Sequence, residues 1–310
     1  SGTDALFLGL KALGVGDGDE VITVSNTAVP TVAAITSTGA TARFVDIDPD
    51  TYLMDAAKLE DAVTGRTKCI LPVHLYGQCA DMDAINTVAK THGLKVLEDC
   101  AQCTGAKYKG RPAGTDGDVA AWSFYPTKVL GGYGDGGMIT TRDEVVAEHA
   151  RSLRMYGMQG RYYADEHGYN SRLDEVHAAI LRLKLKRLDG WVERRRALAA
   201  RYQTALGDAS IVLPQEAADN YHCWYIYVVR HPARDEIMAK LRERDILVNI
   251  SYPWPIHIMT AYAHLGYADG DFPVTERMAT EIFSLPMYPT LSEAEQDTVC
   301  DALHDILAAL

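Results

Sequence analysis

Strand-like and helix-like segments alternate along the first 140 residues, and this alternation constrains the fold more than any other feature of the chain. Short runs rich in β-branched and aromatic residues predict strands at residues 20–24, 41–45, 69–73, 95–99, 119–124 and 138–141. Helical patterns at residues 31–38, 81–92 and 142–155 separate most of these runs. Such alternation is typical of an α/β fold with a mainly parallel sheet and helices on both faces.

The pattern changes in the last third of the chain. A long helix is predicted from about Leu173 to Leu206. After Gly207 a strand at 224–230, a helix at 234–244, a Pro-rich loop at 252–257 and a helix from residue 292 follow. We therefore expect a large domain over residues 1–206 and a small α+β C-terminal domain over residues 207–310.

Charge and hydropathy exclude two classes of partner. The net charge of −12 and the pI near 5.3 argue against a nucleic acid held by phosphate contacts. No apolar run approaches the roughly 18 residues of a membrane span, and no signal peptide with a basic region and an apolar core is present. We expect a cytoplasmic protein.

Six cysteines occur, and two of them, Cys100 and Cys103, form a C-x-x-C pair. Such a pair is consistent with a redox centre or with half of a zinc site. No second pair stands nearby, and the histidines lack the spacing of a zinc module. We interpret the cysteines as reduced, buried residues and expect no metal site.

Lys128 has an unusual setting for a lysine. It follows the apolar run Val119 to Phe124 and precedes a loop that holds five glycines in seven residues. Glycine lets the backbone approach a ligand closely, so the segment is consistent with a lysine that binds pyridoxal phosphate as a Schiff base. A loop lysine that caps a turn explains the segment equally well.

Three other segments favour the cofactor interpretation. Ser1 to Leu6 opens a helix with capping residues, and a helix N-terminus attracts phosphate, although most such starts are simply capped helices. Asp99 ends the predicted strand 95–99, where open α/β sheets place their ligands; an acid that bonds a helix cap is the alternative. The polar stretch 168–175 directly precedes a long helix, and its alternative is an ordinary helix start.

Together these segments resemble the DegT/StrS family of sugar aminotransferases, fold type I enzymes that depend on pyridoxal phosphate. The resemblance extends over essentially the whole chain in order and spacing, and it includes the stretches 1–6, 72–77, 98–102, 123–137, 170–175 and 285–289. The resemblance implies that Lys128 forms the Schiff base and then moves the proton, and that Asp99 pairs with the pyridine nitrogen. It further implies that Gln102 contacts the phenolic oxygen side of the ring.

The same resemblance implies how the phosphate is held and how the sites are shared. Backbone N–H groups of Gly2 and Thr3 and the Ser123 hydroxyl are expected to bind the phosphate. Asn170 is expected to reach the phosphate of the partner subunit's cofactor, in a homodimer with shared active sites.

For the sugar nucleotide, the candidate contacts are aromatic side chains and one histidine in two loops. Arg161, Tyr162 and Tyr163 lie before Asn170, and Trp254 and His257 lie in the Pro-rich loop; these loops suit ordinary packing equally well. The predicted reaction is transfer of an amino group from L-glutamate to a dTDP-linked 3-keto-6-deoxyhexose, in deoxyamino-sugar and antibiotic biosynthesis. A 4-keto-6-deoxyhexose substrate is the first alternative. A sugar dehydratase of the same fold, which carries histidine in place of the lysine, and a non-catalytic regulator are further alternatives.

The sequence departs from the family in two places. Ala28 falls where many members carry an aromatic residue that stacks on the pyridine ring, and His74 and Tyr76 are the candidates to cover that face; a histidine bonded to backbone is the alternative for His74. Family members also carry a helix and a strand before the Ser-Gly-Thr loop, whereas this sequence starts at the loop. We expect that Ser1 is not the natural N-terminus.

Overall fold

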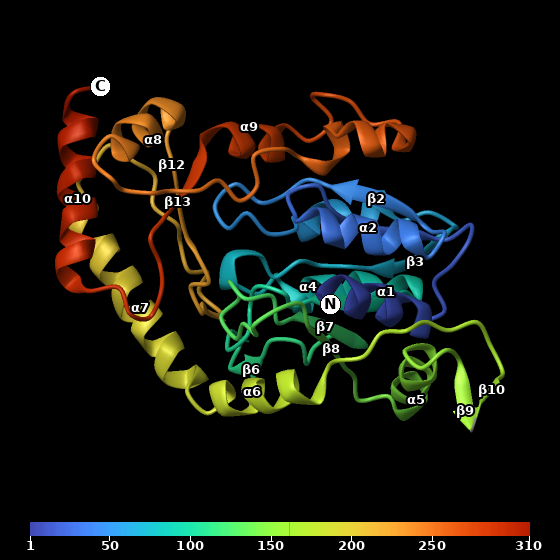
Figure 1. Ribbon diagram of the computed structural model, residues 1–310. Helices are drawn as coiled ribbons and strands as arrows, with labels where there is room; N and C mark the ends of the chain where they lie inside the picture. Colours follow the sequence, from blue (N-terminus) through green and yellow to red (C-terminus); the bar gives the residue numbers. More distant parts are fainter. Residues whose placement is uncertain (161) are drawn as a thin grey trace.

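The computed structural model describes residues 1–160 and 162–310, and Arg161 lies outside the described residues. A six-stranded sheet forms the centre of the molecule, with strand order β2-β1-β3-β4-β7-β8 (Figure 1). The strands are β1 (Glu20–Val24), β2 (Thr41–Val45), β3 (Thr67–Ile70), β4 (Lys95–Asp99), β7 (Val119–Ser123) and β8 (Gly137–Thr140). Neighbouring strands run parallel except β7 and β8, which are antiparallel. The predicted α/β fold with a mainly parallel sheet is confirmed.

Helices connect and cover these strands. The helices of this part are α1 (Gly2–Ala12), α2 (Val29–Ser37), α3 (Leu59–Ala62), α4 (Met82–His92) and α5 (Glu144–Leu153). Helix α1 packs on β7 and β8 and lies beside α2. Local sequence explains the ends of α4, because the Asp81 side chain caps its N-terminus and Gly93 takes the left-handed conformation after its last residue.

Short strands and 3₁₀ turns occupy the connections. The strands are β5 (Lys107–Tyr108), β6 (Arg111–Pro112), β9 (Met158–Gly160), β10 (Tyr163–Ala164) and β11 (Asn220–Tyr221). The 3₁₀ turns are η1 (Ala56–Lys58), η2 (Leu75–Gly77), η3 (Ile256–Ile258) and η4 (Thr260–Leu265). The β9–β10 hairpin lies beside α5, at the outer edge of the molecule (Figure 1).

The predicted long helix from Leu173 to Leu206 is two helices. Two residues separate helix α6 (Glu175–Leu185) from helix α7 (Leu188–Ala205), and the axes of the two helices diverge (Figure 1). Helix α6 buries only Leu181, whereas α7 buries residues along its whole length. Those in its first turns pack in the main core, and those from Leu198 onward pack against the C-terminal part of the chain. After the break, the later part of α7 reaches the C-terminal elements. Because neither a proline nor a glycine marks the break, the helical pattern of the sequence continues across it and predicts a single helix.

A second hydrophobic cluster holds the C-terminal elements together. It is built from α7, β12 (Tyr227–Arg230), α8 (Arg234–Arg242), β13 (Ile282–Leu285) and α10 (Glu293–Ala308). Strands β12 and β13 pair antiparallel. Helix α10 begins at a capping box between Ser292 and Glu295.

The segment between α8 and β13 packs on the large sheet instead. Ile256, Phe272 and Met278 belong to the main core, and Asp46 after β2 accepts the backbone N–H groups of Val274 and Thr275 at 3.0 and 2.9 Å. These bonds fix the start of α9 (Pro273–Glu281). The apolar contacts therefore interleave the two halves of the chain, and the boundary between residues 206 and 207 stays a prediction.

In the part of the chain that the structure describes, no helix is both long enough and apolar enough to span a membrane.

Candidate active site

Asp99 is a buried carboxylate at the carboxyl end of the central strand β4. Its Oδ2 accepts the Thr31 hydroxyl at 2.8 Å, and its Oδ1 accepts the Ala101 N–H at 3.1 Å. Burial raises the pKa of Asp99, and the Ala101 and Thr31 bonds, the Lys128 charge and His74 offset only part of that rise. The ionised form of the Asp99 carboxylate is therefore favoured only when a positive charge lies close to it.

Lys128 lies in the turn that joins β7 to β8. Its backbone N–H bonds Tyr125 O at 2.9 Å, and the chain then doubles back so that Gly132 N–H reaches Phe124 O at 2.7 Å. A Cβ at Gly131 would lie 2.2 Å from Pro126 O, so this turn requires a glycine there. The Lys128 ammonium sits 4.7 Å from the centre of the Tyr225 ring, and its charge acts on Asp99. The structure thus brings together the two residues that the sequence predicts to carry the chemistry.

The N-terminus of α1 meets the end of β7. A Cβ placed on Gly2 would lie 2.6 Å from Ser123 Cβ and 2.9 Å from its hydroxyl oxygen, so only glycine permits this approach. Ser1 and Asp4 form a capping box, and helix geometry leaves the N–H groups of Gly2 and Thr3 without an intrahelical partner. Free N–H groups beside a hydroxyl form a cradle that fits a phosphate.

Gln102 is buried three residues after Asp99, and its amide is paired within the chain. The carbonyl oxygen accepts Tyr76 N–H at 2.8 Å, and the amide nitrogen donates to the Tyr252 hydroxyl at 3.0 Å. Asp99 and Tyr225 both act electrostatically on Tyr252, whose pKa burial raises. Gln102 therefore draws Tyr252 of the C-terminal segment toward the site.

Asn170 is exposed, outside this buried group. It pairs with Met155 in an isolated bridge, and the adjacent Ser171 hydroxyl donates to Asp4 of α1 at 3.1 Å. The Asn170 segment therefore lies beside the first turn of α1 in its own subunit.

The candidate sugar contacts do not converge in one chain. Tyr162, Tyr163 and Trp254 are 96%, 71% and 65% exposed. His257 is buried, and its ring nitrogens bond the Ser25 hydroxyl at 2.8 Å and Glu276 at 3.1 Å. Both ring nitrogens are engaged within the chain, which favours a structural role for His257 over the predicted substrate contact.

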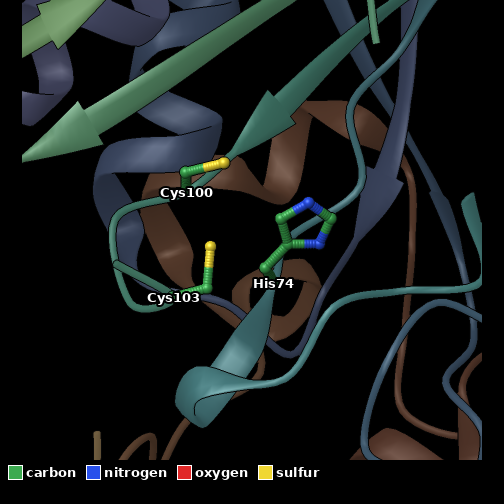
Figure 2. A group of neighbouring side chains, drawn as sticks. All are labelled: His74, Cys100 and Cys103. Carbon is green, nitrogen blue, oxygen red and sulfur yellow. The ribbon is translucent and has the colours of Figure 1, made fainter. Parts of the chain in front are cut away.

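Below the site, His74 lies close to the thiols of Cys100 and Cys103, with the potential ligand atoms within 4.8 Å of one another (Figure 2). Ala80 N–H donates to His74 Nδ1 at 3.1 Å, which leaves the ring proton on Nε2 to bond Glu98 at 2.8 Å. Neither ring nitrogen keeps a free lone pair for a metal. Burial raises the pKa of Cys100 to about 12 and that of Cys103 well above its usual range, so both thiols stay protonated.

Tyr76 is the second candidate to cover the pyridine ring, and Ala28 stands where many family members carry the stacking aromatic residue. The Tyr76 hydroxyl donates to Ser251 O, and its ring packs against Tyr52. Ala28 precedes α2, the helix that carries Thr31. The residue that covers the ring face stays a prediction.

Three residues near the site were not singled out from sequence: Thr31, Tyr225 and Tyr252. Thr31 starts the predicted helix 31–38, and Tyr225 follows a buried Trp in the predicted strand 224–230. Tyr252 lies in the Pro-rich loop that the sequence pointed to. Each reaches Asp99 or Lys128 only through the tertiary fold.

Known proteins match this chain over nearly its whole length, including all the site residues described above. The family described as DegT/DnrJ/EryC1/StrS aminotransferases matches residues 1–304. A dTDP-3-amino-3,4,6-trideoxy-alpha-D-glucose transaminase of Micromonospora megalomicea is 56% identical over 100% of this chain and 84% of its own. A pleiotropic regulatory protein of Geobacillus stearothermophilus is 49% identical over 98% of this chain and 82% of its own.

Among solved structures, that of S. venezuelae DesV in complex with a ketimine intermediate has a TM-score of 0.96 and 45% identity, over 98% of this chain and 82% of DesV. Solved forms of another similar protein, a putative sugar aminotransferase from Streptococcus pneumoniae, include a PLP form and a PMP form.

Proposed function

The chain belongs to the DegT/DnrJ/EryC1/StrS aminotransferase family, whose members depend on pyridoxal phosphate, and on that premise we propose its substrates. We propose that it transfers the amino group of L-glutamate to C-3 of a dTDP-linked 3-keto-6-deoxyhexose. The reaction belongs to deoxyamino-sugar biosynthesis, and we propose that it occurs in the cytoplasm and serves antibiotic formation.

The residues at the carboxyl ends of β4 and β7 fit this cofactor. The Gly2–Ser123 approach, which a Cβ would fill, leaves a cradle for the phosphate. Asp99, buried and with a raised pKa, suits a positively charged ring nitrogen. When bound, pyridoxal phosphate supplies a ring that takes up the electrons released as the substrate C–H bond breaks.

The side chains then have separate tasks. Asp99 holds a proton on the ring nitrogen, because a buried carboxylate without a countercharge is unfavourable. The N–H groups of Gly2 and Thr3 and the Ser123 hydroxyl bind phosphate oxygens. Lys128, whose charge acts on Asp99, would hold the cofactor and move the proton at the substrate carbon. Gln102, whose amide bonds Tyr76 and Tyr252, would contact the phenolic oxygen side of the ring.

The observation that carries the choice of substrate is the 56% identity, over the whole chain, to a transaminase whose name places the nitrogen at C-3. The exposed aromatic side chains of Tyr162, Tyr163 and Trp254 supply faces on which a base and a hexose stack. The loops that carry them differ in position along the chain, so the sugar seat is assembled from separate elements.

We also propose that the active unit is a homodimer in which Asn170 completes the site of the partner subunit. Large apolar side chains are exposed along α6 and on the turn around Lys128. They are Val176 (73% exposed), Leu183 (65%), Leu185 (52%), Tyr125 (51%) and Tyr133 (79%). Exposed apolar side chains gathered on one region are typical of an interface between subunits.

The substrate is tested by assaying the purified enzyme with L-glutamate and two dTDP sugars. The 3-keto-6-deoxyhexose is expected to give the 3-amino sugar, and dTDP-4-keto-6-deoxyglucose is expected to react poorly. A small change in how the hexose is seated alters the rate strongly, because rate depends on near-attack geometry. NMR of the product gives the position of the nitrogen, and faster turnover of the 4-keto sugar with nitrogen at C-4 would reverse the assignment.

Lys128→Ala is the control for this assay. It is expected to bind the cofactor weakly and to lose transamination, because the base is gone. Borohydride reduction of the wild-type holoenzyme, followed by peptide mapping, is expected to place the pyridoxyl group on Lys128.

A further inference from the structure

The aromatic ring of Tyr225 lies beside the Lys128 ammonium. The Lys128 ammonium lies 4.7 Å from the Tyr225 ring centre, within the range of a cation–π contact. The Tyr225 hydroxyl lies 3.3 Å from the hydroxyl of Thr127, the residue before Lys128. Tyr225 therefore contacts the Lys128 turn at two points.

The backbone of Tyr225 is fixed from below by Arg195 of α7. One nitrogen of this buried guanidinium donates to the carbonyl oxygens of Trp224 at 3.1 Å, Tyr225 at 3.0 Å and Met287 at 2.9 Å. Carbonyl oxygens, rather than a carboxylate, are its hydrogen-bond partners in the described structure. Hydrogen bonds from a buried charged group are strong, so these bonds to the carbonyl oxygens hold the backbone in one position.

A glycine on the large sheet lets the Tyr225 segment come close. Gly77 has φ +111°, and a Cβ there would lie 2.8 Å from Tyr225 N and 2.9 Å from Cys223 Sγ. Cys223 N–H bonds Gly77 O at 2.9 Å across the same contact. The C-terminal part of the chain is thus docked at the point where its tyrosine covers Lys128.

We propose that Tyr225 is a positioning residue that holds the free Lys128 ammonium by a cation–π contact whenever the amine is not bonded to the cofactor. This inference rests on the proposed role of Lys128. Held in this way, the amine stays at the Tyr225 ring, where its charge acts on Asp99, instead of moving into solvent on its flexible side chain.

The test measures how fast a small acylating reagent labels the Lys128 amine, by peptide mass spectrometry. A cation held on a ring is shielded from acylation, so Tyr225→Leu is expected to speed labelling of Lys128 by about 2- to 30-fold, the factor that corresponds to a cation–π contact. Tyr225→Phe keeps the ring and is expected to label as the wild type does. Lys107, which lies 5.2 Å from the Tyr221 ring centre, is the internal reference.

Tyr221→Leu is the matched control, since it removes the ring from Lys107 and leaves Lys128 as it is. A merely steric or structural role is separated by replacing Tyr225 with phenylalanine and with 3,4,5-trifluorophenylalanine. The fluorinated ring keeps the shape but weakens the negative face of the ring, so Lys128 labelling is expected to rise with fluorination. This series keeps the test valid if Tyr225→Leu does not fold.

Labelling is run on the holoenzyme without donor, on the holoenzyme with excess L-glutamate, and on cofactor-free enzyme. Protection of Lys128 in the first state and its loss in the other two is the result expected from the proposed function. Equal labelling of Lys128 in all three states contradicts the role of Lys128 itself. Two other results, each with the expected three-state pattern in the wild type, overturn the role of Tyr225 and leave that of Lys128 intact. In the first, the Lys128 labelling rate does not change on fluorination of residue 225; in the second, it is no faster in Tyr225→Leu than in Tyr221→Leu.

Discussion

Asp99 lowers the stability of the cofactor-free protein at neutral pH but favours the binding of a cationic cofactor ring. Burial raises its pKa above the ordinary value, so the folded protein binds the proton more tightly than the unfolded chain does. As the pH rises from the ordinary pKa through the raised one, the unfolded chain loses its proton first. The stability of the cofactor-free protein therefore falls over that interval and stays lower at neutral pH. A cationic ring nitrogen removes this penalty.

Asp99→Asn is therefore expected to raise the Tm of the cofactor-free protein at neutral pH and to leave it unchanged in acid, where Asp99 is protonated in both states. The Thr31 hydroxyl can turn to accept one of the two hydrogens of the new amide, so the contact between residues 31 and 99 is kept. In the holoenzyme the order reverses, and transamination is expected to fall by about 100- to 1000-fold, as for the loss of a preorganised electrostatic contact. Thermal melts at several pH values, with and without cofactor, measure both effects. A lower Tm for the cofactor-free variant at neutral pH would contradict this account.

Residues of the site differ in how far the sequence predicts them. Asp99 and Lys128 are visible because each directly follows an apolar strand, and parallel strands bring their carboxyl ends to one edge. His257 looked equally polar and equally loop-bound, but it is buried between Ser25 and Glu276, and only the fold places those partners around it. Tyr225 reaches Lys128 through the docking of the C-terminal segment on Gly77, which no local pattern announces.

At the scale of elements, the close approach of the α1 N-terminus to β7 requires that residue 2 has no side chain. Helix α1 approaches β7 at Gly2, where any side chain would overlap Ser123. The strands whose period and bounds were clear, such as β1, β2 and β4, are predicted to the residue. The α6–α7 break is missed because no proline or glycine marks it. Leu181 of α6 and Leu188 of α7 both pack in the main core, and only the later part of α7, from Leu198, packs in the second cluster.

Gly2→Ala is expected to weaken cofactor binding by about 10- to 100-fold, the loss that corresponds to one or two charge-assisted hydrogen bonds. The added methyl group would push the first turn of α1 away from the Ser123 hydroxyl, whereas the helix itself gains from alanine. Titration of cofactor-free protein with pyridoxal phosphate measures the affinity. Gly190→Ala in α7, where a Cβ meets nothing within 4 Å, is the matched control and is expected to bind normally. Equal affinities for the two variants would rule out the cradle.

At the scale of the whole molecule, the position of Asn170 leaves two geometries to separate. The Ser171–Asp4 bond holds its segment beside α1 of the same chain, which permits a site completed within one subunit. The exposed Asn170 side chain and the apolar side chains along α6 instead suit a site completed across a two-fold axis. The two geometries give opposite results when defective subunits are mixed.

We expect Lys128→Ala and Asn170→Ala homodimers each to be clearly impaired, and their mixture to recover activity. In a hybrid dimer with shared sites, one site has both substitutions and the other has native Lys128 and native Asn170. With random exchange half of the dimers are hybrids, so about one quarter of all sites would be native, which follows from the two-fold symmetry of the assembly. If each subunit completed its own site, every site in the hybrid would carry one substitution and no activity would return. Subunit exchange is verified by native mass spectrometry on differently tagged chains, so that a missing recovery assigns Asn170 to its own subunit.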